Sequence, residues 1–221
     1  MSASAPESHE NRLAGGPRSS KERIVWGVLV AGLFAIAVFA LFTYLKPPIP
    51  ELQRFGAAPP FTLTTQDGTS LSGTELLGKV WMADFMFTRC QTLCPVLSMR
   101  MKALQTGLRD RTEWSLVSFT VDPEHDTPEI LNAYAQAQGA NTELWTFLTG
   151  DKEAIYDLSI SGFHLGVDDE GGTEVEPILH SQRIILIDGE NEIRGYYDAQ
   201  DDADMRQLLS DAKRVLDEAS P

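Results

Sequence analysis

The hydrophobic pattern divides the chain into one long apolar segment near the amino end and a region where short apolar runs alternate with polar stretches. Residues 24–45 contain no charged side chain, and about 20 apolar residues in a helix cross a bilayer core of roughly 30 Å. Apolar side chains cover every face of this helix, unlike those of a helix in a protein core. A secretory signal has a shorter apolar core. We therefore predict an uncleaved transmembrane anchor at residues 24–45.

The sequence on either side of the anchor predicts its orientation. Positive residues stay on the cytoplasmic side of a membrane, and four of them precede the segment while Lys46 follows it: Arg12, Arg18, Lys21 and Arg23. We expect a single-pass protein of the bacterial inner membrane, with a cytoplasmic amino end and a periplasmic carboxy-terminal domain. Residues 1–23 are polar and predict a disordered cytoplasmic tail. Residues 46–58 are proline-rich and predict a stiff linker.

From residue 59 onward the pattern predicts an α/β domain. Apolar or alternating runs predict strands at residues 61–65, 79–87, 114–121, 144–148, 183–188 and 193–198. Helices are predicted at residues 95–108, from Thr127-Pro128 onward, from Asp151 to about Ser159, and at residues 201–216. This order of elements indicates a mixed sheet flanked by helices over residues 59–216.

Charge and cysteine content narrow the possible functions. The formal net charge of −14 argues against nucleic acid as a partner, because phosphate binding needs a basic surface. Only two cysteines occur, Cys90 and Cys94, and they are too close in sequence to staple distant parts of the fold. Such a pair is typical of metal binding or redox chemistry.

The two cysteines stand where a predicted buried strand passes into a predicted helix, in the segment FMFTRCQTLCP (residues 85–95). Pro95 is tolerated in the first turn of a helix, so the cysteines are expected at a helix amino terminus. The unpaired N–H groups and the helix dipole at that position favour the thiolate. Three intervening residues let both sulfurs turn to one side. The alternative interpretation is two buried apolar cysteines without chemistry.

This segment resembles the copper-binding loop of the SCO/SenC family, whose thioredoxin-like members help assemble cytochrome c oxidase. Three further stretches resemble the family: TVDPEHDTPEIL (120–131), LHSQRIILIDGENEIRGYY (179–197) and PPFTLTTQDG (59–68). The resemblance covers residues 59–213 and implies a thioredoxin-like fold. The chain departs from the family in one position, since many members have proline after the first cysteine where this chain has Gln91.

The resemblance implies copper as the cofactor, with Cys90, Cys94 and His180 as its ligands. Two soft thiolates and one imidazole suit Cu(I), and the same set can hold Cu(II). The other histidines, His9, His125 and His164, stand in no supporting motif, although His125 lies in the loop after the second buried strand and could be near the site.

Two further kinds of residue could belong to the site. Asp122 ends the second buried strand and would lie at the same sheet edge as the cysteines if the strands are parallel. It is interpreted either as a residue outside the ligand set that orients ligands or contacts a partner, or as an ordinary turn aspartate. Met82 and Met86 fall in a buried strand and are interpreted as core residues rather than copper ligands.

Two functions remain open. In the first, the protein is a metallochaperone that receives copper from an upstream donor and delivers it to the dinuclear copper centre of a cytochrome c oxidase subunit, without acting as an enzyme. In the second, it is a thiol–disulfide oxidoreductase in which Cys90 attacks and Cys94 resolves, keeping that subunit's copper-ligand cysteines reduced. A peroxidase is a weaker third. Thiol reductases of this fold usually have two residues between the cysteines and a cis-proline before the facing strand. This chain has three residues between them and His180-Ser181-Gln182 before residues 183–188, which favours copper.

Overall fold

The computed structural model describes residues 19–45, 51–90, 94–168 and 178–219. The chain divides into two compact units, Met1–Pro50 and Glu51–Pro221. In the first unit, helix α1 (Ser20–Tyr44) begins before the expected start of the anchor at residue 24. Its span Ser20–Phe42 has a mean hydropathy of 2.7, so its length and composition allow it to cross a membrane. The predicted disordered tail lies almost wholly outside the described residues.

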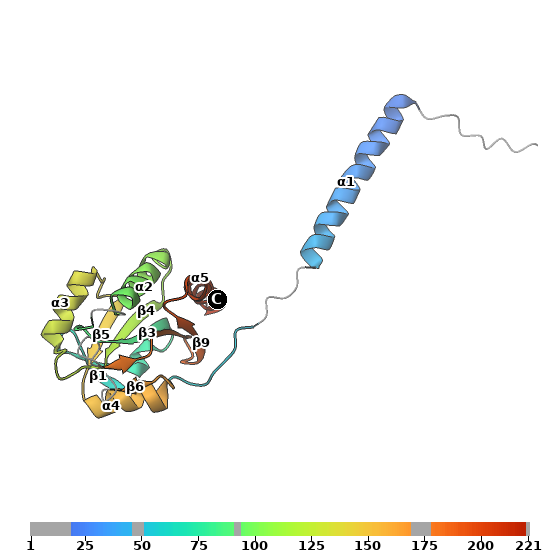
Figure 1. The fold of residues 1–221 in the computed structure, drawn as a ribbon. Coiled ribbons are helices and arrows are strands. Elements are labelled where there is room, and N and C mark those ends of the chain that lie inside the picture. Colours follow the sequence, from blue (N-terminus) through green and yellow to red (C-terminus); the bar gives the residue numbers. More distant parts are fainter. Residues whose placement is uncertain (1–18, 46–50, 91–93, 169–177, 220–221) are drawn as a thin grey trace, which may run out of the picture. The chain divides into compact units, whose positions relative to one another are not determined.

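The second unit is built on a seven-stranded mixed sheet (Figure 1) with the strand order β2-β1-β5-β4-β3-β8-β9. The central strands β3, β4 and β5 are parallel, while β8 pairs antiparallel with β3. Their bounds are β1 (Thr62–Thr65), β2 (Ser70–Ser72), β3 (Val80–Met86), β4 (Trp114–Thr120), β5 (Trp145–Thr149), β8 (Arg183–Ile187) and β9 (Ile193–Asp198). A separate ribbon pairs β6 (Val167–Asp168) with β7 (Leu179–His180).

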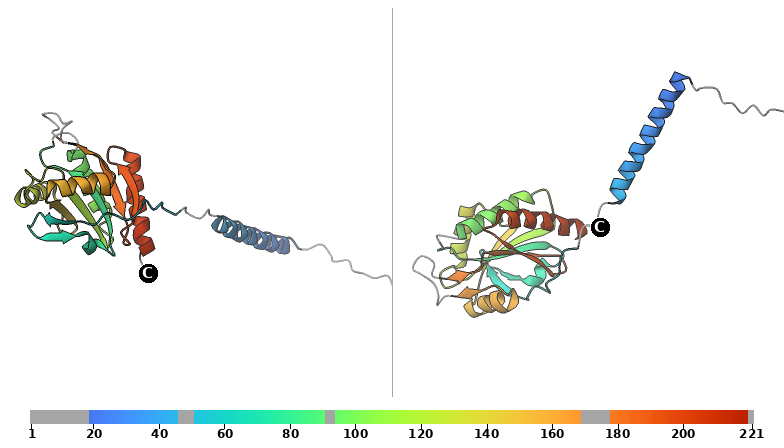
Figure 2. Two further views of the ribbon diagram at one scale, coloured as in Figure 1. Left: turned by 90° about the horizontal axis from the view of Figure 1, so that it is seen from below. Right: turned by 45° about the vertical axis from the view of Figure 1, so that its right-hand side comes forward.

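Helices cover both faces of the sheet. Helices α2 (Cys94–Gly107), α3 (Pro128–Gln138) and α5 (Asp202–Ala219) lie on one face and α4 (Lys152–Asp157) on the other, as Figure 1 and the right-hand view of Figure 2 show. Two short helical turns, Gly73–Leu76 and Leu158–Gly162, complete the fold. All seven residues of β3 are buried, as expected for a central strand covered on both sides. The predicted thioredoxin-like mixed sheet flanked by helices is confirmed.

The longer predicted helices and strands are confirmed, whereas the shortest strands are not among those predicted. The side chain of Thr127 accepts a hydrogen bond from the Ile130 N–H, and Pro128 opens α3. The short strands β2, β6 and β7 were not predicted, because two or three residues are too few to show a hydrophobic period. Residues 169–177, between β6 and β7, lie outside the described residues.

Residues 51–58 belong to the domain, although the sequence predicts a linker there. The buried Arg194 of β9 donates hydrogen bonds to the carbonyls of Leu52 and Gln53, at 3.2 and 3.3 Å. It also forms a buried ion pair with Asp188 at 2.9 Å. These buried contacts with a later hairpin order a segment whose own sequence lacks a helix or strand pattern.

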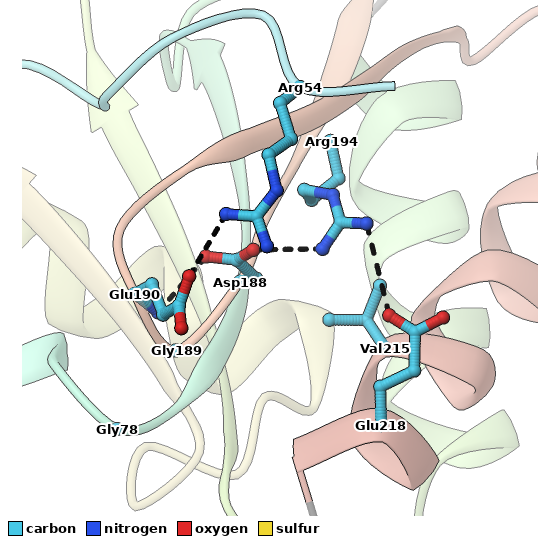
Figure 3. Close-up of a pocket in the computed structure, with 8 residues that line it drawn as sticks. All are labelled: Arg54, Gly78, Asp188, Gly189, Glu190, Arg194, Val215 and Glu218. Atoms are coloured by element: carbon cyan, nitrogen blue, oxygen red, sulfur yellow. Dashed lines mark hydrogen bonds and ion pairs between the residues drawn. The ribbon is translucent and has the colours of Figure 1, made fainter. Parts of the chain in front are cut away.

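Arg54, Asp188 and Arg194 also line a pocket of about 350 Å³ (Figure 3). Arg54 bridges to Glu190 across it, while Arg194 lies between Asp188 and Glu218. This pocket is at the start of β3 and the end of β8. The cysteines follow the end of β3 and His180 precedes β8, so the pocket and the cysteines lie at opposite ends of these strands.

Candidate metal centre

Two parts of the chain that are 86 positions apart bring two sulfurs and one imidazole together. Cys90 follows the end of β3, Cys94 is the first residue of α2, and His180 is the last residue of β7. The Sγ of Cys94 lies 3.4 Å from the Nε2 of His180. The three possible ligand atoms all lie within 4.8 Å of one another, which is close enough to share one metal ion.

The hydrogen bonds of His180 prepare one ring nitrogen as a ligand. Its Nδ1 lies 3.0 Å from the carbonyl oxygen of Ser181, which can only accept, so Nδ1 carries the proton. The Nε2 lone pair then faces the sulfurs, as a metal-binding histidine requires. The ring also packs edge-on against Phe87, with the centroids 5.5 Å apart, and this contact fixes its plane. The donor set therefore fits a soft metal ion such as Cu(I).

The two cysteines are not disulfide-bonded and are almost buried, with 6% of Cys90 and 1% of Cys94 exposed. The backbone N–H of Cys94 points to the Sγ of Cys90 at 3.3 Å, so the helix start supports the first sulfur rather than the second. The hydrogen bond to Cys90 and burial together raise the pKa of the Cys94 thiol. The neighbouring Cys90 and burial therefore disfavour the thiolate at Cys94, contrary to the expectation from its position at a helix start.

The sequence of the chain is similar to that of a known protein family. The family model described as SCO1/SenC matches residues 50–217. The chain belongs to the SCO1/SenC family. The SCO1 protein homolog of Bacillus subtilis is 31% identical over 156 residues, which cover 70% of this chain and 80% of the relative.

Solved structures of SCO1/SenC proteins share the fold. A SCO1/SenC family lipoprotein from Bacillus anthracis superposes with a TM-score of 0.67 at 34% identity, covering 72% of this chain and 95% of the other. BsSco, described as a member of the Sco family of cytochrome c oxidase assembly proteins with a disulfide switch, gives a TM-score of 0.66 at 30% identity. That match covers 76% of this chain and 98% of the other. The start of the matched region at residue 50 agrees with the boundary of the second unit at Glu51.

Asp122 lies beside the cysteine loop of this SCO1/SenC domain, at the sheet edge that parallel β3 and β4 share. It is 6% exposed, and its Oδ2 accepts two hydrogen bonds from the Arg89 guanidinium, at 2.8 and 2.5 Å. Arg89 directly precedes Cys90, so Asp122 reaches the cysteines through this neighbour. The contact with Arg89 could not be predicted from the sequence, because the two residues are 33 positions apart.

The remaining sulfur and imidazole groups lie elsewhere. Met82 and Met86 are buried in the core, as expected. His125 is partly exposed and hydrogen-bonds to Asp126 at 2.9 Å rather than joining the cysteines. His164 is exposed and has a left-handed backbone, with φ of 56°. His9 and Gln91 lie outside the described residues.

A buried carboxyl on β3 lies in the electrostatic environment of the metal centre. Asp84 is 1% exposed, and its Oδ1 accepts a hydrogen bond from Ser118 at 2.5 Å, while Oδ2 has no partner among the described residues. Burial raises the pKa of the Asp84 carboxyl to about 7, although the Ser118 hydrogen bond and the nearby His180 oppose this effect. Asp84 is the one acidic residue in the otherwise apolar segment 80–86, and this pattern could have indicated a buried carboxyl near the cysteines.

Asp84→Asn should stabilise the metal-free protein at alkaline pH. Because the pKa is raised in the folded state, the folded carboxyl keeps a proton that the unfolded chain has lost. The free energy of unfolding of the wild-type protein therefore decreases as the pH rises from about 4 to about 7. Asparagine does not ionise, so we expect its advantage in urea unfolding to grow from pH 5 to on the order of 3 kcal/mol at pH 8.

Asp188→Asn is the matched control, because it also neutralises a buried aspartate. It removes the partner of buried Arg194 and should destabilise the protein, by roughly 3–5 kcal/mol. An Asp84→Asn variant that loses stability equally at pH 5 and pH 8 would show that Asp84 is ionised in the folded protein.

Proposed function

We propose that this SCO1/SenC protein binds one copper ion through Cys90, Cys94 and His180 and delivers it to the dinuclear copper centre of a cytochrome c oxidase subunit. The observation that carries the proposal is the convergence of three donor atoms within 4.8 Å, with the Nδ1 of His180 bonded to the Ser181 carbonyl and its Nε2 facing the Cys94 sulfur. Two thiolates and one imidazole hold Cu(I) and accept Cu(II). The role of BsSco in oxidase assembly supports the choice of recipient.

The proposal places the domain outside the cytoplasm, held at a bacterial inner membrane by α1. The apolar span of Ser20–Phe42 and the excess of basic residues before it support an amino end in the cytoplasm. An upstream donor then supplies copper in the periplasm. In this proposal the protein binds copper and transfers it, and this function requires no catalytic turnover.

A second candidate is a thiol–disulfide oxidoreductase acting on the copper-ligand cysteines of the oxidase subunit. The two sulfurs lie within 4.8 Å of each other, which favours this function because they can join without a large movement. The disulfide switch described for BsSco supports the same chemistry. The segment before β8 favours copper binding instead. Thiol reductases of this fold usually have a cis-proline there, whereas this chain has His180 and no peptide bond among the described residues is cis.

Titrating the reduced full-length protein in detergent micelles with Cu(I), against a competing chelator, should show one tight equivalent. The reason is that the described residues hold one group with two sulfurs and an imidazole, whereas the other possible ligand group offers two carboxylates and one imidazole. Mixing the loaded protein with the metal-free copper domain of the oxidase subunit should then transfer the metal, measured as the copper content of that domain after the two proteins are separated. Zero or two tight equivalents would contradict the one-site proposal, and a loaded protein that retains its copper would contradict delivery.

A further inference from the structure

Asp126 is a fully buried carboxylate next to the cysteine loop, with none of its surface exposed. It accepts four hydrogen bonds from three residues. The backbone N–H and the hydroxyl of Thr88 donate to it at 3.0 and 2.5 Å, and the hydroxyl of Thr120 donates at 2.5 Å. The Nδ1 of His125 lies 2.9 Å away on the exposed side. A buried carboxylate with this many donors is a rigid anchor point.

The anchor acts on the connection between β3 and Cys90. Strand β3 ends at Met86, and Thr88 lies midway between that end and Cys90. Because both donors of Thr88 bind one carboxylate, the chain two residues before Cys90 is fixed to the loop after β4. The amide of Cys90 also bonds to the Phe87 carbonyl at 3.4 Å, which closes a turn over residues 87–90 that contains the anchored Thr88.

The same side chains do not form a second metal site. Possible ligand atoms of Asp122, His125 and Asp126 lie within 4.8 Å of one another. However, the oxygens of Asp126 already accept four hydrogen bonds, and Asp122 accepts two from Arg89. A cation would have to displace the donors of Thr88 and Arg89 from these oxygens.

We infer that Asp126 is a positioning residue that, through Thr88, holds Cys90 where its sulfur meets Cys94 and His180. The distance between the two sulfurs determines how readily they form a disulfide. The position of the Cys90 sulfur also determines the geometry of the three-donor site. Asp126 therefore influences both the redox equilibrium of the cysteine pair and the spectrum of bound copper. Only the copper part of this inference rests on the proposed function.

Asp126→Asn tests the inference in the full-length protein in detergent. Asparagine keeps the shape but turns an NH2 group toward donors, so part of the network is lost. We expect the equilibrium constant between the dithiol and the disulfide, measured against glutathione in metal-free protein, to change at least tenfold, which is about 30 mV. The thiolate-to-copper absorption of the Cu(II)-loaded variant should shift as well.

Asp211→Asn is the matched control. Asp211 is 6% exposed and accepts hydrogen bonds from Tyr197 and Gln207, at 2.8 and 2.9 Å, on β9 and α5. Both variants should unfold at lower urea concentrations, but Asp211→Asn should leave the disulfide equilibrium and the copper spectrum unchanged. Equal shifts in the two variants, or none in Asp126→Asn, would overturn the inference.

Thr88 supplies a second test that does not disturb the carboxylate. Thr88→Ser keeps the hydroxyl and should reproduce the wild-type equilibrium, whereas Thr88→Val removes it and should shift the equilibrium in the same direction as Asp126→Asn. Identical behaviour of the two Thr88 variants would contradict the inference, including in the case where Asp126→Asn fails to fold. If wild-type protein binds no copper, the proposed function fails, and the disulfide equilibrium alone still decides the role of Asp126.

Discussion

Replacing Cys90 or Cys94 by serine should each remove tight Cu(I) binding while leaving the domain folded. A serine hydroxyl stays protonated and is a poor ligand for a soft ion, so either change leaves one thiolate and one imidazole. We expect the affinity to fall at least about a thousandfold, or ~4 kcal/mol. Competition with a Cu(I) chelator measures the loss, and circular dichroism measures the fold.

The folded state should survive because the two cysteines are not disulfide-bonded in this structure. A hydroxyl in place of a buried thiol costs about 1–3 kcal/mol, which lowers the unfolding midpoint without removing the native state. Ser98→Ala is a suitable control. It removes a buried hydroxyl that lies 2.7 Å from that of Tyr134, one turn after Cys94, and touches none of the three donors. If both cysteine variants unfold while Ser98→Ala does not, the cysteines are structural and the metal assignment fails.

His180→Ala should weaken Cu(II) binding strongly and Cu(I) binding less. Cu(II) needs the imidazole nitrogen, whereas two thiolates alone can hold Cu(I). We expect the Cu(II) affinity to fall at least about a hundredfold, or ~3 kcal/mol, and the thiolate-to-copper absorption to change. The Cys90–Cys94 disulfide should still form and exchange, because neither sulfur is altered.

His164→Asn is the control for His180→Ala. It removes an exposed imidazole, and asparagine tolerates the left-handed backbone at that position. The control should keep the wild-type Cu(II) spectrum. In cells that depend on this protein, His180→Ala should impair copper loading of the oxidase. An unchanged spectrum and an active oxidase in His180→Ala, together with an inactive oxidase in Cys90→Ser, would favour the oxidoreductase over the copper chaperone.

The sequence was sufficient to predict the parts of the site that are encoded locally. Cys90, Cys94 and Pro95 lie within six residues, and the apolar run before them predicts the buried strand β3 that delivers them to the sheet edge. His180 is 86 positions from Cys94, so its approach follows from the family resemblance and from the pairing of β8 with β3.

The supporting contacts could not be predicted, because they depend on the tertiary fold. Thr88 and Asp126 are 38 positions apart, and both are ordinary turn residues when considered alone. Residues 51–58 join the domain because the distant Arg194 binds their carbonyls. The pKa of Cys94 depends on the neighbouring Cys90 and on burial, and neither effect follows from the position of Cys94 at a helix start.

The ribbon that carries His180 has a consequence for the kinetics of metal exchange. It has two residues per strand and lies outside the seven-stranded sheet, whereas the cysteines follow a strand buried in the core. Segments with few backbone hydrogen bonds open at a lower free-energy cost than the whole domain. If the protein delivers copper as proposed, we expect the imidazole to leave the ion before the sulfurs do, so that a ligand from an acceptor protein can take its place. The rate of transfer would then depend on opening of the ribbon rather than on unfolding of the core.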